Sequence, residues 1–122
     1  MAKTILIVDD SASLRQVVSI ALKSAGYEVI EASDGKDALG KLTGQKVHLI
    51  ISDVNMPNMD GITLVKEIKQ KAEYKFTPII MLTTESQEDM KAQGQAAGAR
   101  AWVVKPFQPA QMLAAVSKLI AP

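Results

Sequence analysis

Near its N-terminus the chain reads Thr4-Ile-Leu-Ile-Val-Asp-Asp10, a short apolar run that stops on two carboxylates. Three further runs of this kind follow, and they end on Asp53, Thr83 and Lys105. Short apolar runs separated by helix-like segments are typical of strands buried in a parallel sheet. In such sheets the working site lies beyond the carboxyl ends of the strands. We therefore expect these polar side chains to meet in one cleft.

Strand and helix patterns alternate along the chain. We expect strands at residues 4–8, 27–32, 47–52, 78–82 and 101–104, with helical segments between them and after the last one. Gly26, Gly44 and Gly98 follow three of these helical segments, where glycine most readily ends a helix. Glu28 and Glu31 make the second strand the most exposed, so we expect it at a sheet edge. Five strands alternating with five helices predict an α/β fold.

This connectivity leaves few topologies. Right-handed crossovers with helices on both faces require the strand order to reverse once within the sheet. An order of 2-1-3-4-5 meets this requirement and gives a doubly wound, five-stranded parallel sheet of flavodoxin-like type. The first and third strands are then neighbours, so Asp9, Asp10 and Asp53 flank the switch point. Thr83 and Lys105 follow on the fourth and fifth strands.

Composition limits the class of protein. A chain of 122 residues has the size of one domain, so we treat residues 1–122 as a single domain and expect a monomer. The net charge of +1, without long runs of one sign, favours neither nucleic acid nor a membrane as partner. There is no cysteine, and the apolar run after Lys3 is too short for a secretory signal or a membrane span. These features predict a cytoplasmic protein.

Asp9 and Asp10 are adjacent carboxylates at the junction between a strand and a helix. One of them could serve only as the N-cap of that helix, which is the common role of aspartate at such a junction. Two carboxylates that face one cleft repel each other, however, unless a cation compensates. Mg²⁺ is commonly held by one or two carboxylates together with water. We therefore expect both residues to contribute to a magnesium site.

Asp53 is the candidate nucleophile, because a carboxylate can accept a phosphoryl group as an aspartyl phosphate. Catalysis of this transfer depends mainly on positioning and on neutralising negative charge. Mg²⁺ and the Lys105 ammonium would neutralise the charge, and the Thr83 hydroxyl would donate a hydrogen bond to a phosphoryl oxygen. Pro106 follows the lysine, and X-Pro is the one context in which a cis peptide bond costs little. We predict a cis Lys105–Pro106 bond that directs the lysine inward.

Four segments together make the chain resemble a receiver domain of the two-component response-regulator family, over essentially its whole length. They are Ile7-Val-Asp-Asp-Ser11, Ile51-Ser-Asp-Val-Asn-Met-Pro-Asn-Met-Asp-Gly61, Met81-Leu-Thr-Thr84 and Val103-Val-Lys-Pro-Phe107. The resemblance implies that Asp53 receives phosphate from the phosphohistidine of a histidine kinase. It also implies that Asp10, Asp53 and the Asn55 carbonyl hold Mg²⁺, with Asp9 acting largely through water.

The same resemblance implies a switch. Thr83 and Lys105 match the pair of residues that contacts the phosphate in the family. Family members signal by moving that threonine toward the phosphoryl group while an aromatic ring on the fifth strand turns inward. Here that ring belongs to Trp102, where Tyr or Phe is commoner. Thr84 and Pro106 lie beside these residues in the sequence and are grouped with the switch.

The lifetime of the signal is expected to depend on Asn55 and Glu85. They stand two residues past the phosphoacceptor and two past the threonine, where the family tunes attack of water on the aspartyl phosphate. Both side chains can hydrogen-bond a water near the phosphorus, so we expect relatively quick self-dephosphorylation.

The helix expected at residues 87–97 is weakly anchored. It contains Met90 as its only large apolar residue and an interior glycine, Gly94, which costs about 1 kcal/mol relative to alanine. An element with few contacts can shift at little cost in free energy. We expect this helix, the fifth strand and the fifth helix to form the partner surface.

The resemblance implies a signalling phosphoacceptor and not an enzyme that turns over other molecules. The segments Asp9-Asp-Ser-Ala-Ser-Leu-Arg15 and Trp102-Val-Val-Lys-Pro-Phe107 look most like chemotaxis regulators that bind the flagellar motor switch. Because the chain ends after the fifth helix, we expect no output domain and a protein as downstream target. A phosphorelay intermediate or another adaptor stays open, as does a phosphatase partner.

Two other classes of protein use a similar sheet. An aspartate-nucleophile phosphohydrolase needs a second aspartate two residues after the nucleophile, where this chain has Asn55, and room for a cap over the substrate. A flavodoxin-type module needs an anion-friendly loop after the first strand, where Asp9 and Asp10 would repel the FMN phosphate. Turnover of free phosphate esters would favour the first class, and a bound yellow flavin the second.

Overall fold

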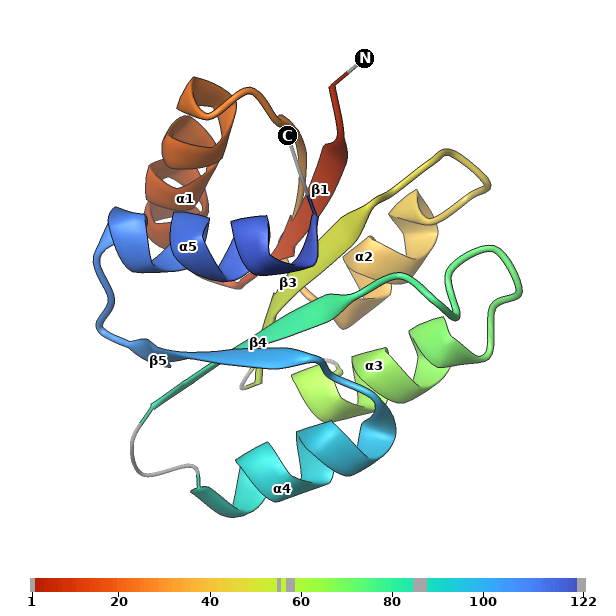
Figure 1. Ribbon diagram of the computed structural model, residues 1–122. Helices are drawn as coiled ribbons and strands as arrows, with labels where there is room; N and C mark the ends of the chain where they lie inside the picture. Colours follow the sequence, from red (N-terminus) through yellow and green to blue (C-terminus); the bar gives the residue numbers. More distant parts are fainter. Residues whose placement is uncertain (1, 55, 57–58, 85–87, 121–122) are drawn as a thin grey trace.

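The computed structural model describes residues 2–54, 56, 59–84 and 88–120, without the side chains of residues 84 and 88–90. Five strands and five helices alternate in it (Figure 1). The strands are β1 (Thr4–Val8), β2 (Glu28–Ala32), β3 (Leu49–Asp53), β4 (Ile79–Thr84) and β5 (Ala101–Lys105). The helices are α1 (Ala12–Ser24), α2 (Gly35–Lys41), α3 (Gly61–Lys69), α4 (Glu88–Ala97) and α5 (Pro109–Leu119).

The strands form one parallel sheet in the order β2-β1-β3-β4-β5, which confirms the predicted topology. Helices α1 and α5 cover one face, and α2, α3 and α4 cover the other (Figure 1). The strand order reverses at β1, so β1 and β3 lie side by side with β2 at one edge. The edge position of β2 was expected from its exposed glutamates, which face solvent in the structure.

Alternating side chains of β1 pack in two separate hydrophobic cores, because successive residues of a strand point to opposite faces of the sheet. Ile5 and Ile7 pack with the apolar faces of α1 and α5, among them Leu22 and Val116. Leu6 and Val8 belong to the other core, which includes Leu64 and Ile68 of α3. All four β1 side chains are completely buried.

The strands continue through the polar residues that the sequence placed just beyond them. Asp53 pairs in register with Leu82 of β4, and Thr84 pairs with Lys105 of β5. The backbone ladder therefore holds the functional side chains on the strands themselves. Some strands begin later than predicted: β2 begins at Glu28 and β3 at Leu49.

Helix caps fit the sequence. Ser11, Asp34 and Asp60 accept backbone N–H groups at the starts of α1, α2 and α3. Pro109 stands at the first turn of α5, where its missing N–H is not needed. None of the helices described is long and apolar enough to cross a membrane.

Candidate functional site

The carboxyl ends of β1 and β3 bring three carboxylates together. Asp9 follows β1, Asp53 ends β3, and Asp10 comes next in the loop to α1. One oxygen from each carboxylate lies within 4.8 Å of the others. Asp9 is completely buried and Asp53 is 6% exposed, whereas Asp10 is open to solvent. The cluster therefore has a closed back and an accessible mouth.

Lys105, at the end of β5, bridges two of these acids. Its Nζ lies 3.2 Å from Asp9 Oδ2 and 3.2 Å from Asp53 Oδ2. Burial lowers the pKa of Lys105, but the charges of Asp53 and then Asp9 outweigh it and raise the pKa above its usual value. The lysine is consequently a fixed positive charge at neutral pH. Three carboxylates facing one ammonium leave the cluster with excess negative charge.

Neither adjacent aspartate serves as the helix cap. Ser11 is the N-cap of α1, and its hydroxyl accepts the N–H of Leu14 at 3.2 Å. Asp9 instead accepts the N–H of Ser11 through Oδ1 at 2.8 Å, while its Oδ2 faces Lys105. Because the cap is filled by another residue, both carboxylates remain directed to the site.

The donor set suits a divalent cation of the hard type. Mg²⁺ prefers oxygen ligands, and it is usually held by one or two carboxylates and several waters. Asp9, Asp10 and Asp53 supply such oxygens from one cluster, with Asp10 on the solvent side. Asn55, whose carbonyl was predicted as a further ligand, lies outside the described residues.

The remaining predicted residues are only partly brought into contact. Thr83 lies on β4 between Asp53 and Lys105 and is 3% exposed, but its hydroxyl bonds to none of the charged groups described. The Lys105–Pro106 peptide bond is cis, as predicted. Glu85 and the side chain of Thr84 lie outside the described part.

Trp102 of β5 packs its ring against α4. The half-buried ring touches the core that includes α3 residues, and its N–H is enclosed without an acceptor in the described ranges. A Cβ at Gly94 would lie only 2.3 Å from Trp102 Cη2. From the sequence, Gly94 was expected only to lower the stability of the helix. In the structure, its lack of a side chain also makes room for the indole of Trp102.

Sequence reasoning missed one contact to the cluster, made by Arg15. Its guanidinium donates to the main-chain carbonyl of Asp9 and pairs with Glu31 of β2. A side chain-to-backbone contact across three elements leaves no periodic trace in a sequence. The one available signal was an arginine facing inward on a helix that starts beside two acids.

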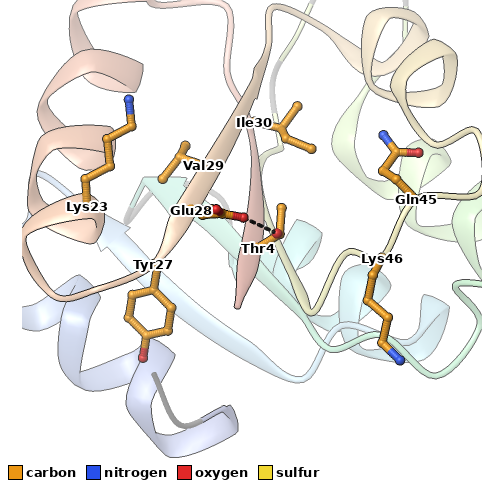
Figure 2. Close-up of a pocket in the computed structure, with 8 residues that line it drawn as sticks. All are labelled: Thr4, Lys23, Tyr27, Glu28, Val29, Ile30, Gln45 and Lys46. Carbon is orange, nitrogen blue, oxygen red and sulfur yellow. Dashed lines mark hydrogen bonds between the residues drawn. The ribbon is translucent and has the colours of Figure 1, made fainter. Parts of the chain in front are cut away.

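One hollow of the structure adjoins the acidic cluster, and another lies away from it. One of about 450 Å³ adjoins Lys105 and is lined by Leu14, Pro106 and Phe107 as well. A larger one of about 540 Å³ lies at the amino ends of β1 and β2, with Lys23 and Lys46 among its lining residues (Figure 2). None of the predicted site residues lines this second hollow, so it is separate from the acidic cluster.

Comparison with known proteins agrees with this geometry. The family model of the response regulator receiver domain matches residues 5–117. The phosphate regulon transcriptional regulatory protein PhoB of Pseudomonas aeruginosa is 38% identical over 120 residues, which are 98% of this chain and 52% of that protein. The chain spans about half the length of the curated relatives it matches.

Solved structures give the same result. The chemotaxis response regulator CheY4 of Vibrio cholerae is 48% identical, with a TM-score of 0.93 over 98% of this chain and 100% of that one. The receiver domain of sensor histidine kinase PA1611 of Pseudomonas aeruginosa, with magnesium coordinated in its active-site cleft, is 27% identical. Its TM-score is 0.88 over 98% of each chain. The chain therefore belongs to the family of response regulator receiver domains of two-component signalling.

Proposed function

We propose that Asp53 is the phosphoacceptor of a signalling switch in this receiver domain. The observation that carries the proposal is the cluster of three carboxylates, in which Lys105 bridges Asp9 and Asp53 while Asp10 lies on the solvent side. The phosphodonor is the phosphohistidine of a histidine kinase. A carboxylate oxygen of Asp53 bonds to phosphorus while the bond from phosphorus to the imidazole nitrogen breaks, and the imidazole takes up a proton.

Each polar neighbour of Asp53 has a defined task in this transfer. The Lys105 ammonium, already 3.2 Å from an Asp53 oxygen, balances charge on the phosphoryl oxygens. Thr83 donates a hydrogen bond to one of those oxygens. Water later attacks the phosphorus, releases phosphate and restores the carboxylate, with Asn55 and Glu85 orienting that water. The chain thus catalyses only its own phosphorylation and dephosphorylation.

Asp9, Asp10 and Asp53 would hold Mg²⁺, together with the carbonyl of Asn55. The ion would supply positive charge to the phosphoryl oxygens during transfer. Their donor chemistry supports this assignment, and so does the magnesium in the cleft of the PA1611 receiver domain.

The output is a change in the face formed by α4, β5 and α5, which binds a downstream protein. A hollow of about 340 Å³ on this face is lined by Trp102, Val104, Gln111 and Lys118, among others. Val104 is 44% exposed there and gives this face an apolar side chain at its surface. Movement of Thr83 toward the phosphoryl group would change the packing of Trp102 beneath this face.

Chemotaxis, with the flagellar motor switch as target, is the pathway we propose. Similarity to CheY4 supports it, because that chemotaxis regulator is 48% identical to this chain. PhoB, a transcriptional regulator, is 38% identical.

Phosphate transfer from a phosphorylated histidine kinase tests the proposal directly. The wild type with Mg²⁺ should gain the mass of one phosphoryl group, and Asp53→Asn should gain none. Trp102 fluorescence should respond to Mg²⁺ in both proteins but to a small phosphodonor only in the wild type. A wild type that stays unphosphorylated with donor and metal would overturn the proposal.

A further inference from the structure

Arg15 lies behind the acidic cluster, on the first turn of α1, and joins three elements. Its Nη1 donates to the carbonyl oxygen of Asp9 at 2.5 Å. Its Nε lies 3.2 Å from Oε1 of Glu31 at the end of β2, and the other oxygen of Glu31 accepts the Ser19 hydroxyl at 3.3 Å. The Arg15 side chain is 17% exposed, so this guanidinium is held and largely shielded from water.

The carbonyl that Arg15 holds belongs to the peptide group joining Asp9 to Asp10. Asp9 has further anchors, because its N–H donates to Ala32 and its carboxylate is bonded to Ser11 and Lys105. In the described ranges no hydrogen bond holds the Asp10 carboxylate. The direction of the Asp10 side chain consequently depends on the orientation of the peptide group that Arg15 fixes.

The charge of Arg15 is matched where it stands. Glu31 pairs with the guanidinium, so the two residues together fix the position of the Asp9 carbonyl and bring almost no net charge to the site. An unpaired arginine at this place would repel a divalent cation. Glu31 thus aims the guanidinium and also cancels its field near the acids.

We propose that Arg15, held by Glu31, is the positioning residue that sets the Asp10 carboxylate for Mg²⁺ binding. The inference rests on the proposed function, in which the three aspartates hold that ion. Groups that orient metal ligands typically change metal affinity by about 10–100-fold when they are removed.

Geometry and electrostatics predict opposite results for Arg15→Met, which keeps an apolar stem and removes the guanidinium. If Arg15 acted only by its charge, removing a cation beside the acids would tighten Mg²⁺ binding. If it positions Asp10, removal should weaken Mg²⁺ binding by about tenfold. The dissociation constant for Mg²⁺ is measured by titration calorimetry and by Trp102 fluorescence, with thermal unfolding to verify the fold.

Two controls match the charge changes. Lys23→Met removes a cation from the exposed last turn of α1, away from the acids, and should leave the Mg²⁺ affinity unchanged. Glu31→Gln should weaken Mg²⁺ binding several-fold, whereas Glu28→Gln, the same change at an exposed site of β2, should not. Arg15→Lys keeps the charge but cannot make both contacts, so it should resemble Arg15→Met.

The double variant Arg15→Met with Glu31→Gln should bind Mg²⁺ no more weakly than Arg15→Met alone, because Glu31 acts through Arg15. Unchanged or tighter binding in Arg15→Met would overturn the inference. Should that variant fail to fold, an unchanged affinity in Glu31→Gln would overturn it instead. A wild type that binds no Mg²⁺ would refute the proposed function itself, so the two failures are distinguishable.

Discussion

Lys105 has two opposite effects on the acidic cluster: it stabilises the carboxylates, and it limits their affinity for a metal ion. The ammonium compensates the buried Asp9 and the nearly buried Asp53, which would otherwise repel each other. It also competes with a metal ion for the same oxygens. Under the proposed function, a phosphoryl group on Asp53 would change this balance, because the lysine could then turn from the carboxylates to the phosphoryl oxygens.

Replacing Lys105 by Met should therefore have two opposite effects. Mg²⁺ should bind several-fold more tightly, because one cation leaves the cluster. Phosphorylation of Asp53 by a small donor should slow by at least about tenfold, because positive charge at the phosphoryl oxygens is lost. Fluorescence titration and initial rates of phosphorylation measure the two, with Lys118→Met on α5 as the control. Equal phosphorylation rates for both variants would contradict the assigned role.

Gly94 and Trp102 form a second residue-scale pair. Because a Cβ at Gly94 would lie 2.3 Å from the indole, Gly94→Ala should displace the ring or α4 and cost about 1–3 kcal/mol of stability. Trp102 emission should shift to longer wavelength as the ring becomes more exposed. Urea unfolding and emission spectra test this.

Gly40 of α2 provides the matched control, since a Cβ there meets nothing within 4 Å. Gly40→Ala should stabilise the protein by about 0.4–1 kcal/mol. Trp102→Phe combined with Gly94→Ala should recover much of the loss, because the clashing part of the ring is gone. A Gly94→Ala protein as stable as wild type would show that the ring is not seated against this helix.

At the scale of elements, His48 ties the entry of β3 to the start of β1. The Nδ1 atom of the His48 ring accepts the backbone N–H of Thr4 at 3.0 Å, and the backbone N–H of His48 donates to the Thr4 carbonyl at 2.8 Å. Burial, followed by the charges of Lys3 and Lys46, lowers the pKa of His48 below its usual value. Only the neutral ring can accept the Thr4 bond, so this junction depends on pH.

The direction of the pH effect follows from that lowered pKa. Between the folded and unfolded pKa values the unfolded chain binds more protons, so the free energy of unfolding falls as pH drops below about 6.5. His48→Asn keeps an acceptor near the position of Nδ1 and does not titrate. Chemical unfolding of both proteins at pH 7.5 and at about pH 5 should show a larger loss for the wild type. Parallel losses would contradict the prediction.

The elements themselves were largely predictable. Strand order, helix number and the edge position of β2 follow from alternating apolar runs, because burial and right-handed crossovers leave few solutions. Ends were less predictable: Asp53, Thr84 and Lys105 are polar, yet the sheet ladder includes them. Local polarity alone cannot show where backbone pairing stops.

For the site, the convergence of the charged residues was predictable, but their finer contacts were not. Asp9, Asp10, Asp53 and Lys105 converge because their strands do, which the topology alone implied. The contact of Arg15 with a main-chain carbonyl and the close approach at Gly94 depend on packing in three dimensions. Such contacts have no fixed spacing in a sequence.

For the whole molecule, the acidic cluster and the proposed target face lie on different surfaces. The acidic cluster opens at the carboxyl ends of the strands beside the hollow lined by Leu14 and Phe107. The proposed target face lies around Val104 on the outer side of β5. A charge placed on one surface should therefore leave the other function intact.

Val104→Asp should abolish binding of the phosphorylated protein to a motor-switch peptide while a small donor still phosphorylates Asp53 normally. The reason is that a buried carboxylate at an apolar contact is costly. Val17 of α1, 51% exposed, offers the control substitution Val17→Asp, which should leave peptide binding unchanged. Calorimetric titration with the peptide measures both. Equal affinity for the two variants would place the target elsewhere.

Strand β1 contributes side chains to both cores, with Ile5 and Ile7 on one side and Leu6 and Val8 on the other. Neither helical layer can therefore unfold alone, because it packs against strand β1, which also supports the other layer. Heat or urea should then disrupt Tyr27, near α5, and Trp102, near α4, at one common midpoint, so that the domain is lost as a cooperative unit.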